Sequence, residues 1–251
     1  MNIDESKRVK GKFAVMQSVK RLLAALNFFT RIPFWKLASL EASHYENIVP
    51  LWPVAGVVTG GAMAVVLYLS SFILPVNIAV LLALLSRFIL TGGLHEDGFA
   101  DFCDGFGGGS TGVPDKDRER TLKIMKDSHI GTYGVIGLIF YYLLIWSVMT
   151  SLSSLVSLEM MALCLIGVDV LSKYMSSMIV SFLSYARDVS DAKNGVVYNK
   201  GGRPYLAMVV SVLTLNAPVL FFLFRWMKRR IGGYTGDCCG ATFIIMELYN
   251  Y

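Results

Sequence analysis

Residues 72–105 read FILPVNIAVLLALLSRFILTGGLHEDGFADFCDG, an apolar run that ends in two glycines and a cluster of acids. The apolar part, residues 72–93, is long enough to cross the hydrocarbon core of a bilayer as one helix. The acidic part follows without a linker, so we expect it to lie at a membrane surface. The stretch therefore predicts a membrane helix that carries a polar segment to the interface.

The whole chain has the composition of a membrane protein. Of its 251 residues, 55% are hydrophobic and only 16% are charged, whereas soluble domains carry about 25% charged residues. The mean hydropathy is +0.56. The net charge of +5 suits basic residues in cytoplasmic loops and does not indicate a nucleic-acid partner. We predict an all-α, multi-pass helical integral membrane protein with about five to seven transmembrane or re-entrant helices.

The other apolar runs place the remaining spans at residues 49–70, 133–153, 158–183 and 205–224. The last run is interrupted at Asn216-Ala217-Pro218. Five full spans would put the basic residues 225–230 outside, against the positive-inside rule, so we expect the run to break there and re-enter. The polar segments 95–132 and 184–204 are both predicted to be cytoplasmic.

We therefore expect residues 1–251 to form a single membrane-embedded domain. Residues 1–48 are rich in lysine and arginine and are predicted to be a cytoplasmic or interfacial segment. Within it, Val15, Val19, Leu22, Leu26 and Phe29 form a helical stripe. That stripe indicates either an amphipathic helix on the membrane surface or an ordinary packing helix.

Three charged residues lie inside predicted spans. Arg87 is interpreted either as a side chain that snorkels to the cytoplasmic end of its helix or as a charge that faces a functional site. Asp169 and Lys173 are spaced at i and i+4, which predicts a buried ion pair or an intramembrane functional pair.

The acid cluster predicts a metal site. Asp97, Asp101 and Asp104 stand at i, i+4 and i+7, so a helix would place all three carboxylates on one face. Carboxylates are the ligands that Mg²⁺ and Mn²⁺ prefer. The alternative is a solvated, charged loop. Asp237, in a glycine-rich turn, is either a fourth carboxylate from the far end of the chain or an ordinary turn residue.

The segment 95–132 also holds groups that suit an anionic ligand. Arg120 and Lys126 would face phosphate oxygens, with His129 as a further candidate, and Gly131 would let the backbone approach the ligand. His95 is a candidate base, metal ligand or helix-start residue. Together with the carboxylates, these groups favour phosphoryl-type transfer assisted by a metal.

Several motifs in the chain resemble those of the cobalamin synthase family (adenosylcobinamide-GDP ribazoletransferase). The central ones are Gly92-Gly93-Leu94-His95-x-Asp97-Gly98-x-Ala100-Asp101-x-x-Asp104-Gly105 and Arg120-x-Leu122-x-Ile124-Met125-Lys126-Asp127-Ser128-x-x-Gly131-x-x-Gly134. The similarity extends to Phe28-x-Thr30-Arg31-Ile32-Pro33, Pro53-x-x-Gly56, Tyr185-Ala186-Arg187 and Gly232-Gly233-x-Thr235-Gly236-Asp237. The chain departs from the family in several respects. A single apolar run stands between the last two motifs, where two spans are common, and Lys173 stands where an arginine is common.

The resemblance implies an Mg²⁺-dependent phosphotransferase of the cytoplasmic (inner) membrane of a prokaryote, with its site facing the cytoplasm. α-Ribazole, or its 5′-phosphate, would attack adenosylcobinamide-GDP, giving adenosylcobalamin, or its 5′-phosphate, and GMP. Association with other cobalamin-assembly enzymes is also implied. The residues carried over as metal ligands are Asp97, Asp101 and Asp104. Those carried over as catalytic residues are Asp97, His95 and Asp237. Those carried over as phosphate- or substrate-binding residues are Arg120, Lys126, Ser128, Gly131 and Arg187.

Two rival functions remain open at this point. A CDP-alcohol phosphotransferase shares the fragment Asp101-x-x-Asp104-Gly105, but the Ala-Arg that follows it in those enzymes and their later Gly-x-x-x-Asp-x-x-x-Asp are absent. A small-molecule transporter would suit Asp169, Lys173 and the interrupted fifth run. Against a transporter, the polar residues concentrate outside the predicted spans.

Overall fold

The computed structural model describes residues 3–187 and 204–251, and every regular element in them is a helix apart from one isolated bridge, so the predicted all-α class is confirmed. Two short 3-10 turns lie at Phe34–Lys36 and Val49–Leu51. The helices are α1 Ile3–Phe29, α2 Ala42–Tyr45, α3 Trp52–Ser70, α4 Val76–Thr91, α5 Leu94–Gly108, α6 Pro114–Ile124, α7 Thr132–Leu152, α8 Leu158–Phe182, α9 Pro204–Leu213, α10 Ala217–Ile231 and α11 Gly236–Asn250.

Three segments are long and apolar enough to cross a membrane: Val49–Ser70, Thr132–Leu152 and Leu158–Phe182. They agree closely with three of the predicted spans. Helices α4 and α5 would together form a fourth span, but they meet at an angle of 90°. The predicted interruption near Asn216 is confirmed, since α9 and α10 are separate short helices. Most of the predicted polar segment 184–204 lies outside the described residues.

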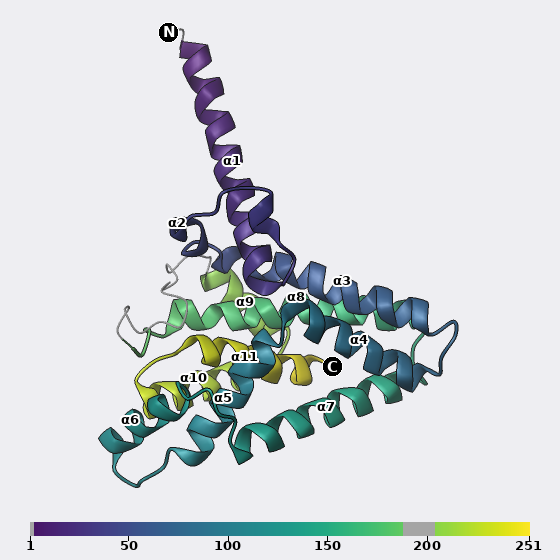
Figure 1. Ribbon diagram of the computed structural model, residues 1–251, viewed down its shortest axis with the longest axis vertical. Helices are drawn as coiled ribbons and strands as arrows, with labels where there is room; N and C mark the ends of the chain where they lie inside the picture. The colour runs from purple at the N-terminus through teal and green to yellow at the C-terminus, as the bar shows by residue number, and fades with distance from the viewer. Residues whose placement is uncertain (1–2, 188–203) are drawn as a thin grey trace.

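The long helices pack as a bundle around the short helix α11 (Figure 1). Helix α3 lies along α8, α4 packs on α3, and α7 runs along the lower edge of the view. The close approach of α3 and α8 depends on glycine: a Cβ atom at Gly56 or Gly60 would come within 2.8 Å of the α8 backbone. Helix α11 packs against both α5 and α8, and α1 projects away from the bundle.

The bend between α4 and α5 is made by two consecutive glycines. Gly92 and Gly93 have φ angles of +70° and +73°, a region that residues with a side chain rarely adopt. The bend turns α5 back into the bundle, where it packs against α7 and α11. The acidic half of segment 95–132 is therefore a packed helix instead of a loop, with Glu96 and Asp104 buried and Asp97 exposed. Helix α6 and the residues after it are largely exposed.

Candidate active site

The site begins where α5 crosses α11. Gly98 of α5 and Gly240 of α11 face each other, and a Cβ atom at Gly98 would lie 3.1 Å from the Cα of Asp237. A Cβ atom at Gly240 would lie 3.1 Å from the carbonyl oxygen of His95. Because neither glycine has a side chain, the two backbones touch, and the first turn of α5 meets the first turn of α11.

This crossing brings together two carboxylates from distant parts of the chain. Asp97 lies in the first turn of α5, and Asp237 lies in the first turn of α11. A carboxylate near a helix N-terminus is stabilised by the partial positive charge of the exposed N–H groups. Both positions are therefore favourable for an acidic side chain.

The approach of Asp237 is fixed by the bridge between Tyr185 and Tyr234. The Tyr234 amide donates to the Ser184 carbonyl oxygen at 2.9 Å, and the Ala186 amide donates to the Tyr234 carbonyl oxygen at 2.8 Å. At Gly233 a Cβ atom would overlap the Ser184 carbonyl, so this pairing requires glycine. The glycine-rich motif thus positions the start of α11 by backbone pairing.

Asp97 and Asp237 line one cavity of about 210 Å³ between α1, α3, α5, α8 and α11. Its other polar side chains are His95, Lys173 and Ser176. The rest of the wall is mostly aromatic and is formed by Phe28, Phe29, Trp52 and Phe243 with Leu94 and Cys239. An enclosed pocket with apolar walls and a few polar groups is typical of a ligand site.

A second, wider cleft of about 690 Å³ lies between α6 and residues 185–187, which follow α8. Arg118, Lys123, Lys126 and Arg187 line it together with Glu119 and Tyr185, so basic side chains predominate. Burial raises the pKa of the Tyr185 phenol, while Arg187 opposes the rise, so the hydroxyl stays protonated and can donate a hydrogen bond. The cleft has the charge expected of a site for phosphate groups.

Hydrogen bonds and one ion pair hold the walls of the cleft together. Arg118 donates to the carbonyl oxygens of Ile231 at 3.1 Å and Ala186 at 2.9 Å, and Arg187 donates to that of Leu122 at 3.0 Å. Hydrogen bonds from Thr111 and the charge of Arg230 lower the pKa of Asp117, which holds Arg230 at 3.1 Å. These contacts join α6 to α10 and to the Tyr185–Tyr234 bridge.

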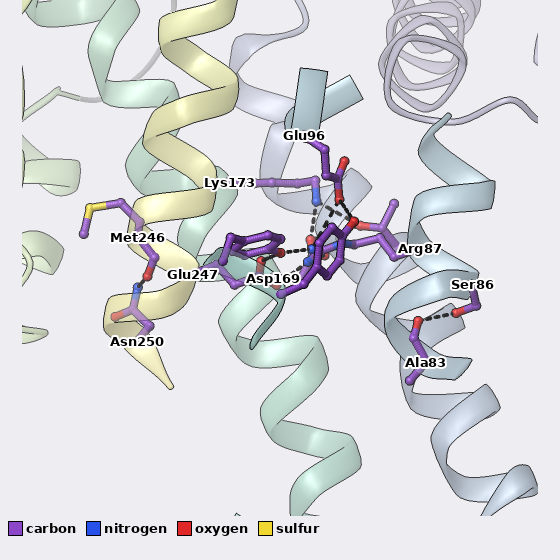
Figure 2. A network of polar contacts seen from close by, with 12 residues as sticks. Ala83, Ser86, Arg87, Glu96, Asp169, Lys173, Met246, Glu247 and Asn250 are labelled. Carbon is purple, nitrogen blue, oxygen red and sulfur yellow. Dashed lines mark hydrogen bonds and ion pairs between the residues drawn. The ribbon is translucent and has the colours of Figure 1, made fainter. Parts of the chain in front are cut away.

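Behind the cavity lies a network of buried charges (Figure 2). Arg87 of α4 pairs with Glu247 of α11 and lies 3.8 Å from Asp169 of α8 and 3.6 Å from Glu96 of α5. Lys173 pairs with Asp169. All five side chains are at most 4% exposed. Such groups tolerate burial only when they are well partnered.

Hydroxyl groups complete this network. Lys173 donates to the Thr59 hydroxyl at 3.0 Å, and that hydroxyl donates to Asp169 at 2.9 Å. Tyr141 donates to Glu247 at 2.6 Å. The network thus ties α3, α4, α7, α8 and α11 together, and Lys173 connects it to the cavity.

Sequence comparison identifies the relatives of the chain. The profile of the cobalamin-5-phosphate synthase family matches residues 21–251. The chain belongs to this family. It is 33% identical to the adenosylcobinamide-GDP ribazoletransferase of Shewanella amazonensis over 94% of each chain, and 32% identical to that of Shewanella frigidimarina over 97% of each chain. No solved structure matches the chain significantly.

Membership of the cobalamin-5-phosphate synthase family favours the transferase over both rival functions. In these two comparisons the alignments also run over nearly the whole of both chains. The glycine-rich motif that carries Asp237 stands beside α5 despite the single apolar run before it.

The site residues that the family resemblance suggested do not all lie together in the structure, and most of them lie at one of two places. Asp97, His95 and Asp237 meet at the aromatic cavity, whereas Lys126 and Arg187 meet at the basic cleft. The remaining candidates line neither place: Asp101 is partly buried on α5, and Arg120 and Ser128 are exposed.

Asp104 makes structural contacts that its spacing did not predict, and its assignment as a metal ligand stays a prediction. It is 7% exposed, and its two carboxylate oxygens accept the amides of Gly131 at 2.7 Å and Gly134 at 2.9 Å. It therefore holds the start of α7 against α5. Within residues 3–187 and 204–251, no three His, Cys, Asp or Glu side chains are gathered as a metal site.

The buried network corrects one interpretation and extends another. Arg87 does not snorkel: it is 0% exposed and its partner Glu247 is 160 residues away. The Asp169–Lys173 ion pair is confirmed, but it is part of the larger network. That Lys173 also lines the cavity was missed, because helical spacing shows which residues share a face and not what that face meets.

Proposed function

We propose that the chain is an adenosylcobinamide-GDP ribazoletransferase. It joins adenosylcobinamide-GDP to α-ribazole, or to α-ribazole 5′-phosphate, and releases GMP in the late steps of cobalamin biosynthesis. Family membership and the names of the relatives support this activity. The structural observation that carries it is the meeting of Asp97 and Asp237 at one cavity beside a basic cleft.

The reaction needs few groups from the protein. The ribose hydroxyl oxygen of α-ribazole forms a bond to the β-phosphorus of the donor, the bond between that phosphorus and the bridging oxygen breaks, and the oxygen leaves with GMP. The hydroxyl proton must pass to a base. Asp97 and Asp237 are the carboxylates that line the cavity, so either can accept the proton, and positioning supplies much of the rate.

The side chains present fit a magnesium ion. Mg²⁺ is usually held by one or two protein carboxylates together with substrate phosphates. Asp97 and Asp237 line one cavity and would supply those carboxylates, and Asp101, one turn after Asp97, is a further candidate. When bound, the ion would neutralise the diphosphate and stabilise the leaving GMP.

The basic cleft would bind the phosphates of the donor. Lys123, Lys126 and Arg187 offer charged donors to phosphate oxygens, and Tyr185 offers a neutral hydroxyl. Arg120, which is exposed on α6, would assist at the edge of the cleft. The donor would then extend from the cleft toward the carboxylates of the cavity.

We place the site on the cytoplasmic side of the inner membrane, since α6 and the last turn of α10 carry many basic residues. A single new cysteine in place of the exposed Ser128 tests this orientation. An impermeant thiol reagent should label it in inside-out vesicles and not in intact cells, relative to the unmodified chain. Labelling in intact cells would show that Ser128 faces outward, which is the opposite of the proposed orientation.

The activity is tested with the purified full chain in detergent. We would supply adenosylcobinamide-GDP, α-ribazole and Mg²⁺, and follow GMP release and the corrinoid product. Asp97→Asn and Asp237→Asn should each lower turnover by about 100-fold or more, because they remove a charged ligand or base. Glu159→Gln, an exposed acid at the start of α8, is the matched control and should keep full activity.

A folded wild-type chain that releases no GMP would refute the proposed activity. Full turnover by both aspartate variants would instead show that the chemistry takes place elsewhere in the molecule.

A further inference from the structure

The aromatic cavity is small compared with the substrates of this reaction. Its volume is about 210 Å³. That is room for one bicyclic aromatic ring with part of a sugar, and a corrin macrocycle is much larger. The walls are faces and edges of Phe28, Phe29, Trp52 and Phe243, which suit a planar aromatic ring.

The second observation is His95, which lies in this wall. Its ring stacks on Phe29 with centroids 5.7 Å apart and contacts Phe243 at 4.1 Å. It is 3% exposed, and neither ring nitrogen makes a hydrogen bond to any part of the chain that the structure describes. A buried imidazole with both nitrogens unsatisfied costs free energy, so the side chain indicates a ligand that supplies a donor or an acceptor.

The charges of the cavity distinguish between the two substrates. Two carboxylates line it, and its only lysine among the described residues, Lys173, is already paired with Asp169. Without a bound metal ion, a wall of this charge disfavours a phosphate group and accepts an uncharged nucleoside. Phosphates have the basic cleft on the other side of the Tyr185–Tyr234 bridge.

We propose that this cavity binds the base and ribose of the acceptor nucleoside, α-ribazole, and that His95 is a specificity-determining residue that hydrogen-bonds it. The assignment rests on the proposed function. The base would lie among the aromatic rings, and the ribose hydroxyl that attacks would face Asp97 and Asp237, which are the acceptors available to it.

Equilibrium dialysis of the detergent-solubilised full chain tests this assignment. The probes are α-ribazole, α-ribazole 5′-phosphate, GMP and GDP, each without the second substrate. His95→Leu should raise the Kd for α-ribazole about tenfold, the equivalent of about 1.4 kcal/mol, because it removes both hydrogen-bonding nitrogens. His95→Gln, which keeps one donor and one acceptor, should recover part of the affinity.

The aromatic wall is tested with a matched pair of phenylalanines. Phe28→Ala should raise the Kd for α-ribazole about tenfold, as expected for the loss of one stacked ring. Phe140→Ala, at an exposed position of α7 away from the cavity, should leave it unchanged. Thermal unfolding checks that each variant folds. If His95→Leu does not fold, the binding measurement on Phe28→Ala tests the assignment.

The remaining outcomes overturn the assignment. If the variants weaken the binding of GDP and leave the binding of α-ribazole unchanged, the cavity holds the guanosine of the donor. If neither ligand is affected while wild-type turnover is normal, the cavity binds no base at all. A wild-type chain that binds α-ribazole at the cavity but releases no GMP would refute the proposed activity and not the cavity assignment.

Discussion

Glu96 and Asp97 are neighbours on one turn of α5, yet they face different surroundings. Glu96 turns toward Arg87 and the buried network, at 3.6 Å, whereas Asp97 lines the cavity. The network satisfies its charges with one another and leaves little room for a ligand. The cavity presents its carboxylates where a substrate can reach them. The comparison shows that an acid in this bundle acquires its role from what it faces, which the sequence around it does not reveal.

The largest expected difference between the two regions is their response to loss of Mg²⁺. Chelation with EDTA should reduce GMP release to background, because the cavity carboxylates would need the ion to act on a diphosphate. The unfolding temperature should not change, since the network pairs its charges without a metal. Added Mg²⁺ should restore turnover. Undiminished turnover in EDTA would rule out the magnesium mechanism.

Removing a charge from the network should damage the fold instead of the chemistry. Arg87→Leu leaves Glu247 and Glu96 without their buried counter-charge, so we expect a loss of about 3–5 kcal/mol in the free energy of unfolding. Denaturant titration in detergent measures it. Replacing Glu247 by leucine as well should recover part of the loss. An equally stable single variant would mean that the network contributes little.

Asp104 lies on the same helix as Asp97 but should behave like a network residue. Asp104→Asn weakens two charge-assisted hydrogen bonds to the α7 amides, and an expected loss of about 1–3 kcal/mol in unfolding free energy follows. Turnover per folded molecule should stay near that of the wild type. If the Asp104→Asn variant needs a higher Mg²⁺ concentration for half-maximal turnover, Asp104 is instead a ligand of the metal ion.

The smallest effect is expected at the basic cleft. Lys126→Ala should raise the KM for adenosylcobinamide-GDP about tenfold at low salt, with kcat nearly unchanged, because one exposed phosphate contact is lost. Lys116→Ala, on α6 just before Lys126 in the chain but outside the cleft, is the matched control. Equal effects of both substitutions would point to general attraction by a basic surface and not to a defined contact.

Hydropathy was sufficient to locate the long helices. The spans Val49–Ser70, Thr132–Leu152 and Leu158–Phe182 follow directly from apolar runs bounded by polar residues. The 90° bend at Gly92-Gly93 did not follow, because a pair of glycines permits several backbone conformations and only packing selects one. The bend is what turns the helix of the acid cluster toward α7 and α11, where Asp104 is buried while Asp97 stays exposed.

The candidate site was only partly predictable, because tertiary packing decides which of its residues meet. Asp97 and Asp237 were both suggested, but their meeting depends on the contact of Gly98 with α11, which no local pattern encodes. The hydrogen bonds of Asp104 to Gly131 and Gly134 could not be predicted, because its spacing places it on a helix face without saying what that face meets. Of the two interpretations of Arg87, snorkelling is wrong, and the sequence could not exclude it because its partner Glu247 is 160 residues away.

The pairing of Tyr185 with Tyr234 has a consequence for the order of substrate binding. Tyr185 lines the cleft, while the residues after Tyr234 lead to Asp237 in the cavity, so the two ligand sites share one short piece of backbone. A ligand that immobilises this backbone from one side lowers the entropy cost of binding on the other side. The two substrates would then bind cooperatively, and by thermodynamic reciprocity each would increase the affinity for the other by the same factor.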